Sequence, residues 1–207
     1  MFVCSIITFG FAGGALILRN LRQKRYSVRL RCKVKDKYKY VPLFFTINNR
    51  NCKVHIYKHL PCKVTCSYYG LQHILEFIKR ARYTLNLCMC MLTSNEIQDA
   101  LVDAHNKGVK VRFIADKMMA ENRATRMEFL KSAGIPIKTQ VQTVETVIHH
   151  KFCYCDENYP SNRKLFFGSL NLTIQGLTSN WDSVIFTDNR FLILQYKNIF
   201  EDLWTEF

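Results

Sequence analysis

The feature that most constrains the fold is an alternation of amphipathic and apolar segments between residues 70 and 141. Residues 70–82 place Leu71, Ile74 and Ile78 on one helical face, and residues 83–92 form an apolar run typical of a buried strand. The same helix-then-strand order recurs twice, over 94–108 and 109–116 and over 121–134 and 135–141. Such alternation predicts an α/β layered sheet with parallel strands, flanked by helices.

Further apolar segments extend this sheet on both sides of the alternation. Strands are expected at 41–47, 147–155, 164–168 and 181–187. A closing helix is predicted over 189–207, and its expected core residues are Phe191, Leu194, Ile199, Leu203 and Trp204.

The distribution of charge points to a polyanionic partner. The formal net charge is +14, but residues 19–39 hold ten Lys and Arg against the single Asp36, a net of +9. The body of the chain is therefore only moderately basic. A basic chain of this kind favours nucleic acid or an acidic membrane surface, and composition alone does not choose between them.

Residues 1–18 contain no charged side chain and predict a membrane anchor. As a helix this run would be about 27 Å long, enough for a thin bilayer. A cleaved signal peptide is the rival interpretation, but here the basic residues follow the apolar run instead of preceding it. A buried helix of the domain fits poorly beside so charged a linker. The predicted organisation is an anchor at 1–18, a basic linker at 19–40 and a catalytic domain at 41–207, with the basic side in the cytosol.

The nine cysteines indicate free thiols and a metal site. Their number is odd, and several lie in apolar strand-like runs, so a reducing compartment without disulfides is expected. Within an insert at 50–68, the spacing of Cys52, His55, Cys62 and Cys66 suggests tetrahedral structural zinc, with His59 as a rival histidine ligand. The alternative is a loop with incidental cysteines.

The segment VIHHKFCYCDENYPSNRKLFFGSLNLT, residues 147–173, carries groups suited to phosphate chemistry. On a strand, His149 and Lys151 point to the same face, roughly 7 Å apart, and His150 points away. An imidazole can attack or protonate while an ammonium neutralises phosphate oxygens. Gly168 permits a close backbone approach, and Ser169 and Asn171 add short polar groups. Asp156 or Asp182 could orient an imidazole through its second nitrogen. Each of these residues alone is ordinary surface or turn chemistry, and the specificity lies in their joint pattern.

The joint pattern resembles the signature of the phospholipase D superfamily. It reads His149-x-Lys151, four residues, Asp156, then Gly168-Ser169-x-Asn171, and Asp182 stands where that family carries a further acidic residue. The resemblance implies a phospholipase D-like sheet. The interval between Asp156 and Gly168 is longer than in the common signature, which predicts an extended hairpin beside the site.

The full signature occurs once, whereas the family's active sites use two. The resemblance therefore implies a homodimer with the site at an isologous interface. His149 of one subunit would attack phosphorus and form a phosphohistidine, and His149 of the partner subunit would protonate the leaving oxygen and later activate water. Both copies of Lys151 and Asn171 would hold the phosphoryl oxygens, with no catalytic metal required.

The anchor, basic linker, zinc insert and single signature together resemble the Zucchini branch of the superfamily, the mitochondrial phospholipase D-like proteins. This resemblance implies attachment to the mitochondrial outer membrane, and a single-strand-specific endoribonuclease that cleaves PIWI-interacting RNA precursors and leaves 5′-monophosphates. The alternative is a phospholipase that hydrolyses cardiolipin to phosphatidic acid, and a third option is a scaffold without activity. Residues expected to line an RNA channel are Lys117, Arg123, Arg126, Arg163 and Lys164.

Overall fold

The computed structural model describes residues 38–63, 65–141 and 146–207. The described residues belong to one compact unit, Tyr38–Phe207. The predicted anchor at 1–18 and nearly all of the basic linker lie outside the described residues. In the described part of the chain, no helix has the length and apolar character needed to cross a bilayer.

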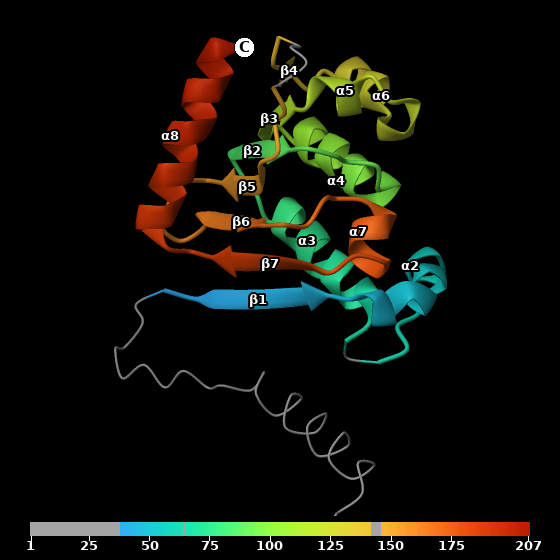
Figure 1. Ribbon diagram of the computed structural model, residues 1–207. Coiled ribbons are helices and arrows are strands. Elements are labelled where there is room, and N and C mark those ends of the chain that lie inside the picture. Colours follow the sequence, from blue (N-terminus) through green and yellow to red (C-terminus); the bar gives the residue numbers. More distant parts are fainter. Residues whose placement is uncertain (1–37, 64, 142–145) are drawn as a thin grey trace, which may run out of the picture. The chain divides into compact units, whose positions relative to one another are not determined.

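A seven-stranded mixed sheet forms the centre of the unit (Figure 1). Its spatial order is β1-β7-β6-β5-β2-β3-β4. The strands are β1 (Tyr40–Phe45), β2 (Thr84–Met89), β3 (Lys110–Ala115), β4 (Ile137–Thr139), β5 (Lys151–Cys155), β6 (Lys164–Gly168) and β7 (Asp182–Thr187).

The predicted parallel pairing holds for only part of this sheet. Strands β2, β3 and β4 are parallel to one another, but β5, β6, β7 and β1 each pair antiparallel with their neighbours. The parallel strands predicted from the alternation are therefore confirmed for β2, β3 and β4, and the hairpin predicted after Asp156 accounts for the antiparallel pairing of β5 with β6. The turn at 156–163 between β5 and β6 is too short to hold a crossover helix, so the chain must return antiparallel.

Helices cover both faces of the sheet. The long α8 lies on one face, and α3 and α4 lie on the other (Figure 1). The helices are α2 (Lys53–Lys58), α3 (Ser67–Lys79), α4 (Asn95–Asn106), α5 (Lys117–Ala120), α6 (Met127–Ser132), α7 (Ile174–Thr178) and α8 (Arg190–Glu206), with 3₁₀ turns η1 (Ile47–Cys52) and η2 (Arg123–Thr125).

The continuous helix predicted over 121–134 is absent from this described stretch. Helix α5 begins earlier, at Lys117, because the Asp116 carboxylate accepts a hydrogen bond from the backbone N–H of Met119 at 3.1 Å. Arg126 then takes a left-handed conformation, with φ of 50°, which separates η2 from α6. The apolar spacing was read correctly as helical, but the backbone reversal at Arg126 is not visible in it.

The buried side chains form two clusters, one on each face of the sheet. The larger lies against α3 and α4, and the smaller joins Phe152 and Tyr154 of β5 to α8. On α8 the fully buried residues are Ile193 and Phe200, whereas Phe191 is 66% exposed. The buried face of this helix therefore differs from the predicted one, although the predicted residues Leu203 and Trp204 do pack against the smaller cluster. Ile199 is exposed and Leu194 lies outside both clusters.

Candidate functional site

The signature residues gather at one edge of the sheet. Parallel strands β2 and β3 end there at Met89 and Ala115, and antiparallel β5 begins there, with Lys151 opposite Met89. Strand β6 also ends at this edge, because Phe167 lies opposite Phe152. We call this side of the sheet the Lys151 edge. The carboxyl ends of parallel strands are a common position for ligand sites in α/β sheets.

His150 and Lys151 differ in their surroundings. The His150 ring makes an edge contact with Phe152, which belongs to the core cluster under α8. Lys151 is buried, and its ammonium donates a hydrogen bond to the backbone carbonyl of His149 at 2.9 Å. The strand begins at Lys151, later than predicted, so the exposed His149 lies just before it. The choice of His149 as nucleophile stays a prediction.

The charge of Lys151 is set by burial and by its neighbours. Burial lowers the pKa of its ammonium, while the negative forms of Cys90, Asp182 and Cys88 oppose that shift. Burial also lowers the pKa of His150, and the positive charges of Lys151 and His149 act in the same direction. The result is a partly desolvated cation beside imidazoles, an arrangement suited to an anionic ligand.

Ser169 and Asp182 form a hydrogen-bonded pair at the Lys151 edge. The Ser169 hydroxyl donates to the Asp182 carboxylate at 2.7 Å and accepts from the backbone N–H of Ser183 at 3.1 Å. A Cβ built on Gly168 would lie 2.1 Å from the carbonyl oxygen of Ser183. The close backbone approach at Gly168 is therefore made by β7, and the glycine lets β6 and β7 pair at this point.

Asn171 reaches the same edge through the loop after β6. Leu172 donates its N–H to the Met91 carbonyl and forms a parallel bridge with Leu92, which places the loop beside the end of β2. The side-chain Oδ1 of Asn171 is buried and has no hydrogen-bond partner among the described residues. A buried polar atom without a partner is costly, so it suggests a group supplied by a ligand or a second subunit.

Asp156 lies away from the Lys151 edge, so the structure does not place it with the other predicted catalytic residues. It follows the last residue of β5, so it lies roughly 16 Å along the strand from Lys151. Its buried carboxylate accepts hydrogen bonds from the backbone N–H groups of Arg82, Tyr83 and Thr84 at 2.8–2.9 Å. These bonds fix Arg82, Tyr83 and Thr84, where β2 begins, which indicates a structural role for Asp156.

The hairpin expected beside the site is also at the opposite end of the sheet. Lys164 lies opposite Cys155, the last residue of β5, and the Arg163 Nε lies 3.5 Å from the Asp188 carbonyl. An antiparallel turn necessarily lies at the end of the strand that precedes it. Arg163 and Lys164 therefore cannot line a channel at the Lys151 edge, and that prediction was wrong.

Two of the remaining predicted basic residues do follow the strands that end at the Lys151 edge. Lys117 begins α5 directly after β3, and Arg126 donates to the Asn95 side chain at 2.9 Å. Both line a cavity of about 380 Å³. They are partly neutralised, because Lys117 lies 4.0 Å from Glu121 and Arg126 lies 3.6 Å from Asp99. Arg123 lies in η2, and its side chain is outside the described part of the structure.

Sequence reasoning missed a polar network that holds the segment before Lys151. The Asp116 carboxylate accepts from the backbone N–H of Ile148 at 3.1 Å and from the Gln140 side chain at 2.7 Å. Gln140 in turn accepts from the backbone N–H of Lys117 at 3.1 Å. An aspartate at the carboxyl end of a predicted parallel strand was the available signal. Cys90, whose negative form would act on Lys151, is a second residue that was missed.

The four predicted metal ligands come together within the insert at 50–68. One donor atom from each of Cys52, His55, Cys62 and Cys66 lies within 4.8 Å of all the others. The Cys66 sulfur is 3.6 Å from His55 Nδ1, and the Cys52 and Cys62 sulfurs are 4.0 Å apart. Ligands of a tetrahedral zinc ion are separated by about 3–4 Å, since each lies 2.0–2.3 Å from the metal. The residues therefore fit zinc.

His59, the rival ligand, is excluded from this cluster. It ends α2 in a left-handed conformation, and its exposed ring makes an edge contact with Tyr68. The seven described cysteines are all free thiols.

Comparison with known proteins assigns the chain to a family. The model of the family described as "Cardiolipin synthase, PLD-like domain" matches residues 74–204, well over half of the chain. The chain belongs to the phospholipase D superfamily. Its similarity to Zucchini homologues makes it a Zucchini-like member.

Curated relatives are named mitochondrial cardiolipin hydrolases. The protein of that name from Chlamydomonas reinhardtii is 30% identical over 150 residues, which cover 72% of this chain and 64% of the relative. The one from Drosophila melanogaster is 30% identical over 161 residues, covering 70% and 63%. The chain thus spans less than two thirds of the length of these two relatives. The human protein is 28% identical over 71% of this chain.

Solved structures share the fold at low sequence identity. NucT from Helicobacter pylori superposes with a TM-score of 0.64 at 16% identity, covering 82% of this chain and 98% of that one. Nuc from Salmonella typhimurium, a phospholipase D family member, gives a TM-score of 0.62 at 20% identity, covering 82% and 96%. These similarities establish the phospholipase D-like mixed sheet flanked by helices.

Proposed function

We propose that this chain is a phosphodiesterase whose site is the Lys151 edge. The observation that carries the proposal is the juxtaposition there of Lys151, the Ser169–Asp182 pair and Asn171, next to the exposed His149. A partly buried cation stabilises the phosphorane-like transition state more strongly than an exposed one, because less water screens its charge.

The reaction proceeds in two displacements. A ring nitrogen of His149 attacks phosphorus, the P–N bond forms, and the leaving oxygen takes a proton from His149 of the partner subunit. That second imidazole then removes a proton from water, the hydroxide attacks phosphorus, and the P–N bond breaks. The Lys151 ammonium and the side-chain NH2 group of Asn171 donate to the non-bridging oxygens in both steps. Protein cations provide the charge stabilisation, so a catalytic metal is not part of the proposal.

A homodimer completes the site. The chain carries one His149-x-Lys151 signature, and the mechanism needs a nucleophile and an acid at the same phosphorus. Two copies related by an isologous interface at the Lys151 edge would provide both. A partner there could also supply the missing hydrogen bond to Asn171.

Single-stranded RNA, including precursors of PIWI-interacting RNAs, is the proposed substrate. The cavity that Lys117 and Arg126 line also contains Lys131, against the carboxylates of Glu121 and Glu128, which leaves an excess of one positive charge. Such a surface suits a sugar–phosphate backbone better than acyl chains. The Zucchini-like character of the chain supports the same choice, and cleavage would leave 5′-monophosphate ends.

Cardiolipin hydrolysis to phosphatidic acid is the second candidate, and two observations favour it. The curated relatives carry that activity in their names. Exposed apolar side chains also flank the Lys151 edge, notably Val147 at 59% and Trp181 at 70% exposure. These could rest against a lipid surface. The relatives' names likewise support a mitochondrial location, for which we propose the outer membrane with the domain facing the cytosol.

We propose that the cluster formed by Cys52, His55, Cys62 and Cys66 holds one structural zinc ion. All four coordination positions are filled by protein, as in sites that stabilise folds. The ion would tie η1 and α2 to the start of α3, and it lies outside the catalytic chemistry.

The decisive experiment offers the purified protein three substrates in EDTA: single-stranded RNA, duplex RNA and cardiolipin vesicles. The proposal expects cleavage of single-stranded RNA only. His149→Asn should abolish this cleavage, whereas the neighbouring control His150→Asn should retain it at a somewhat reduced rate. Hydrolysis of cardiolipin with RNA left intact would select the second candidate. Activity that survives His149→Asn in a clean preparation would refute the site itself.

A further inference from the structure

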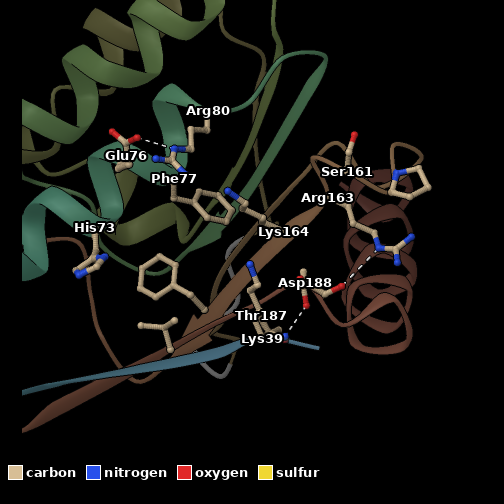
Figure 2. A pocket seen from close by; sticks show the side chains of 13 residues that line it. Lys39, His73, Glu76, Phe77, Arg80, Ser161, Arg163, Lys164, Thr187 and Asp188 are labelled. Atoms are coloured by element: carbon tan, nitrogen blue, oxygen red, sulfur yellow. Dashed lines mark hydrogen bonds and ion pairs between the residues drawn. The ribbon is translucent and has the colours of Figure 1, made fainter. Parts of the chain in front are cut away.

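A second cavity, of about 420 Å³, lies at the end of the sheet opposite the Lys151 edge. It is bounded by α3, the start of β1, the end of β7 and the turn between β5 and β6 (Figure 2). The phosphodiesterase proposal makes no use of it. Lys164, which lines it, is opposite Cys155, so the cavity lies roughly 13 Å along β5 from Lys151.

Positive charge dominates this cavity. Its lining includes the cations Lys39, Arg80, Arg163 and Lys164, against the carboxylates of Glu76 and Asp188, which leaves an excess of two positive charges. Arg80 pairs with Glu76 on α3. Lys39 and Lys164 have no acidic partner within 4.0 Å among the described residues, and Figure 2 shows both side chains extending between the strands and α3.

The positions of these cations are fixed by the backbone. The Asp188 carboxylate accepts from the N–H of Lys39 at 2.8 Å, which attaches the entry of β1 to the end of β7. Lys164 and Phe186 project from neighbouring strands on the same side of the sheet, since Phe166 and Phe186 are opposite each other. The charges are therefore held on a rigid sheet instead of on a mobile loop.

The floor of the same cavity is apolar. Val41, Phe77 and Phe186 line it, and the rings of Phe77 and Phe186 are 6.0 Å apart. A site that combines an apolar floor with unpaired cations suits a ligand that has an anionic group attached to an apolar body.

We propose that this cavity binds a phosphomonoester, with its phosphoryl group between Lys39 and Lys164 and its organic part on Val41 and Phe186. A phosphomonoester carries about −1.5 to −2 charges at neutral pH, which matches the excess of two positive charges. A phosphodiester carries only one. The source is either a phosphatidic acid headgroup or a soluble phosphate ester, and the apolar floor favours the lipid.

The cavity has a further feature that favours a membrane source. Lys39 is the last of the ten basic residues in 19–39, so in the sequence the most basic segment of the chain ends at a residue that lines the cavity. Lysines and arginines near an anionic bilayer each contribute about 1 kcal/mol to its attraction. A lipid bound here would not cover the Lys151 edge, which lies at the other end of the sheet.

The test measures acetylation rates of individual lysines in the full chain by mass spectrometry. Lys39 and Lys164 report on the cavity, and exposed Lys107, after α4, is the internal control. The protein is incubated with phosphatidylcholine vesicles alone, with vesicles containing phosphatidic acid or phosphatidylserine, with glycerol 3-phosphate, and with single-stranded RNA. Phosphatidic acid should slow acetylation of Lys39 and Lys164 about tenfold and leave Lys107 unchanged.

Variants distinguish specific binding in the cavity from non-specific attraction of the basic protein to anionic lipid. Lys39→Gln should weaken the protection of Lys164 by phosphatidic acid about tenfold, the scale of one charge-assisted hydrogen bond, whereas Lys107→Gln should not. Protection by glycerol 3-phosphate equal to that by phosphatidic acid would assign the site to a soluble ester. Equal protection by phosphatidylserine, stronger protection by RNA, or no protection at all would overturn the proposal. None of these readouts depends on phosphodiesterase activity.

Discussion

Replacing Asp156 tests whether the aspartate of the signature acts in chemistry or in folding. Its carboxylate accepts three backbone hydrogen bonds at 2.8–2.9 Å in a fully buried position. Each such bond to an ionised oxygen contributes at least about 1.5 kcal/mol. Asp156 also has a φ of 52°, a left-handed conformation that costs alanine roughly 1 kcal/mol. Asp156→Ala should therefore lower the free energy of unfolding by about 5–6 kcal/mol.

Asp156→Asn is the matched variant. Asparagine tolerates the left-handed conformation and retains one acceptor oxygen, so its cost should be about 2 kcal/mol. Urea denaturation followed by tryptophan fluorescence, to which Trp204 stacked on Phe200 contributes, measures both values. Phosphodiesterase turnover of the folded Asn variant should stay within a few-fold of the parent. Unchanged stability combined with lost turnover would refute the structural role of Asp156.

Three further predictions follow from the site. Gly168→Ala should destabilise the fold by more than about 2 kcal/mol in the same urea assay, since its Cβ would lie 2.1 Å from a backbone oxygen, whereas Gly108→Ala, with open space around it, should cost only about 1 kcal/mol. As the pH is raised, activity should decline before the pH reaches 10.5, the ordinary lysine value, because burial lowers the pKa of Lys151 and its charged form is lost as the pH rises. Lys151→Arg should move this decline to a higher pH. Elemental analysis should find one zinc per chain. Cys62→Ser should lose the zinc and melt at a lower temperature, whereas His59→Ala should retain it. A protein that folds without metal would contradict the site.

Local pattern was sufficient for most of the elements and for the metal ligands. The apolar spacing predicted α3, α4, β3 and β6 to within a few residues, because burial on one face imposes its period directly on the sequence. The Cys52-to-Cys66 spacing also predicted the cluster, since these ligands lie within one short insert. Only the structure decided between His55 and His59, because that choice depends on where α2 ends.

The sequence by itself determined which residue types the Lys151 edge could contain, but not which of them meet there. His149, Lys151, Ser169 and Asn171 are close in the chain, and the predicted strands bring them to one end of the sheet. Asp156, Arg163 and Lys164 are equally close in sequence, yet the antiparallel return of β6 places them at the opposite end. Strand direction depends on pairing with β2 and β7, which are distant in the chain. The hairpin itself was predicted from the sequence, but only the tertiary structure showed that it borders a second, basic cavity, because the rest of that cavity comes from β1, β7 and α3, which are distant in the chain.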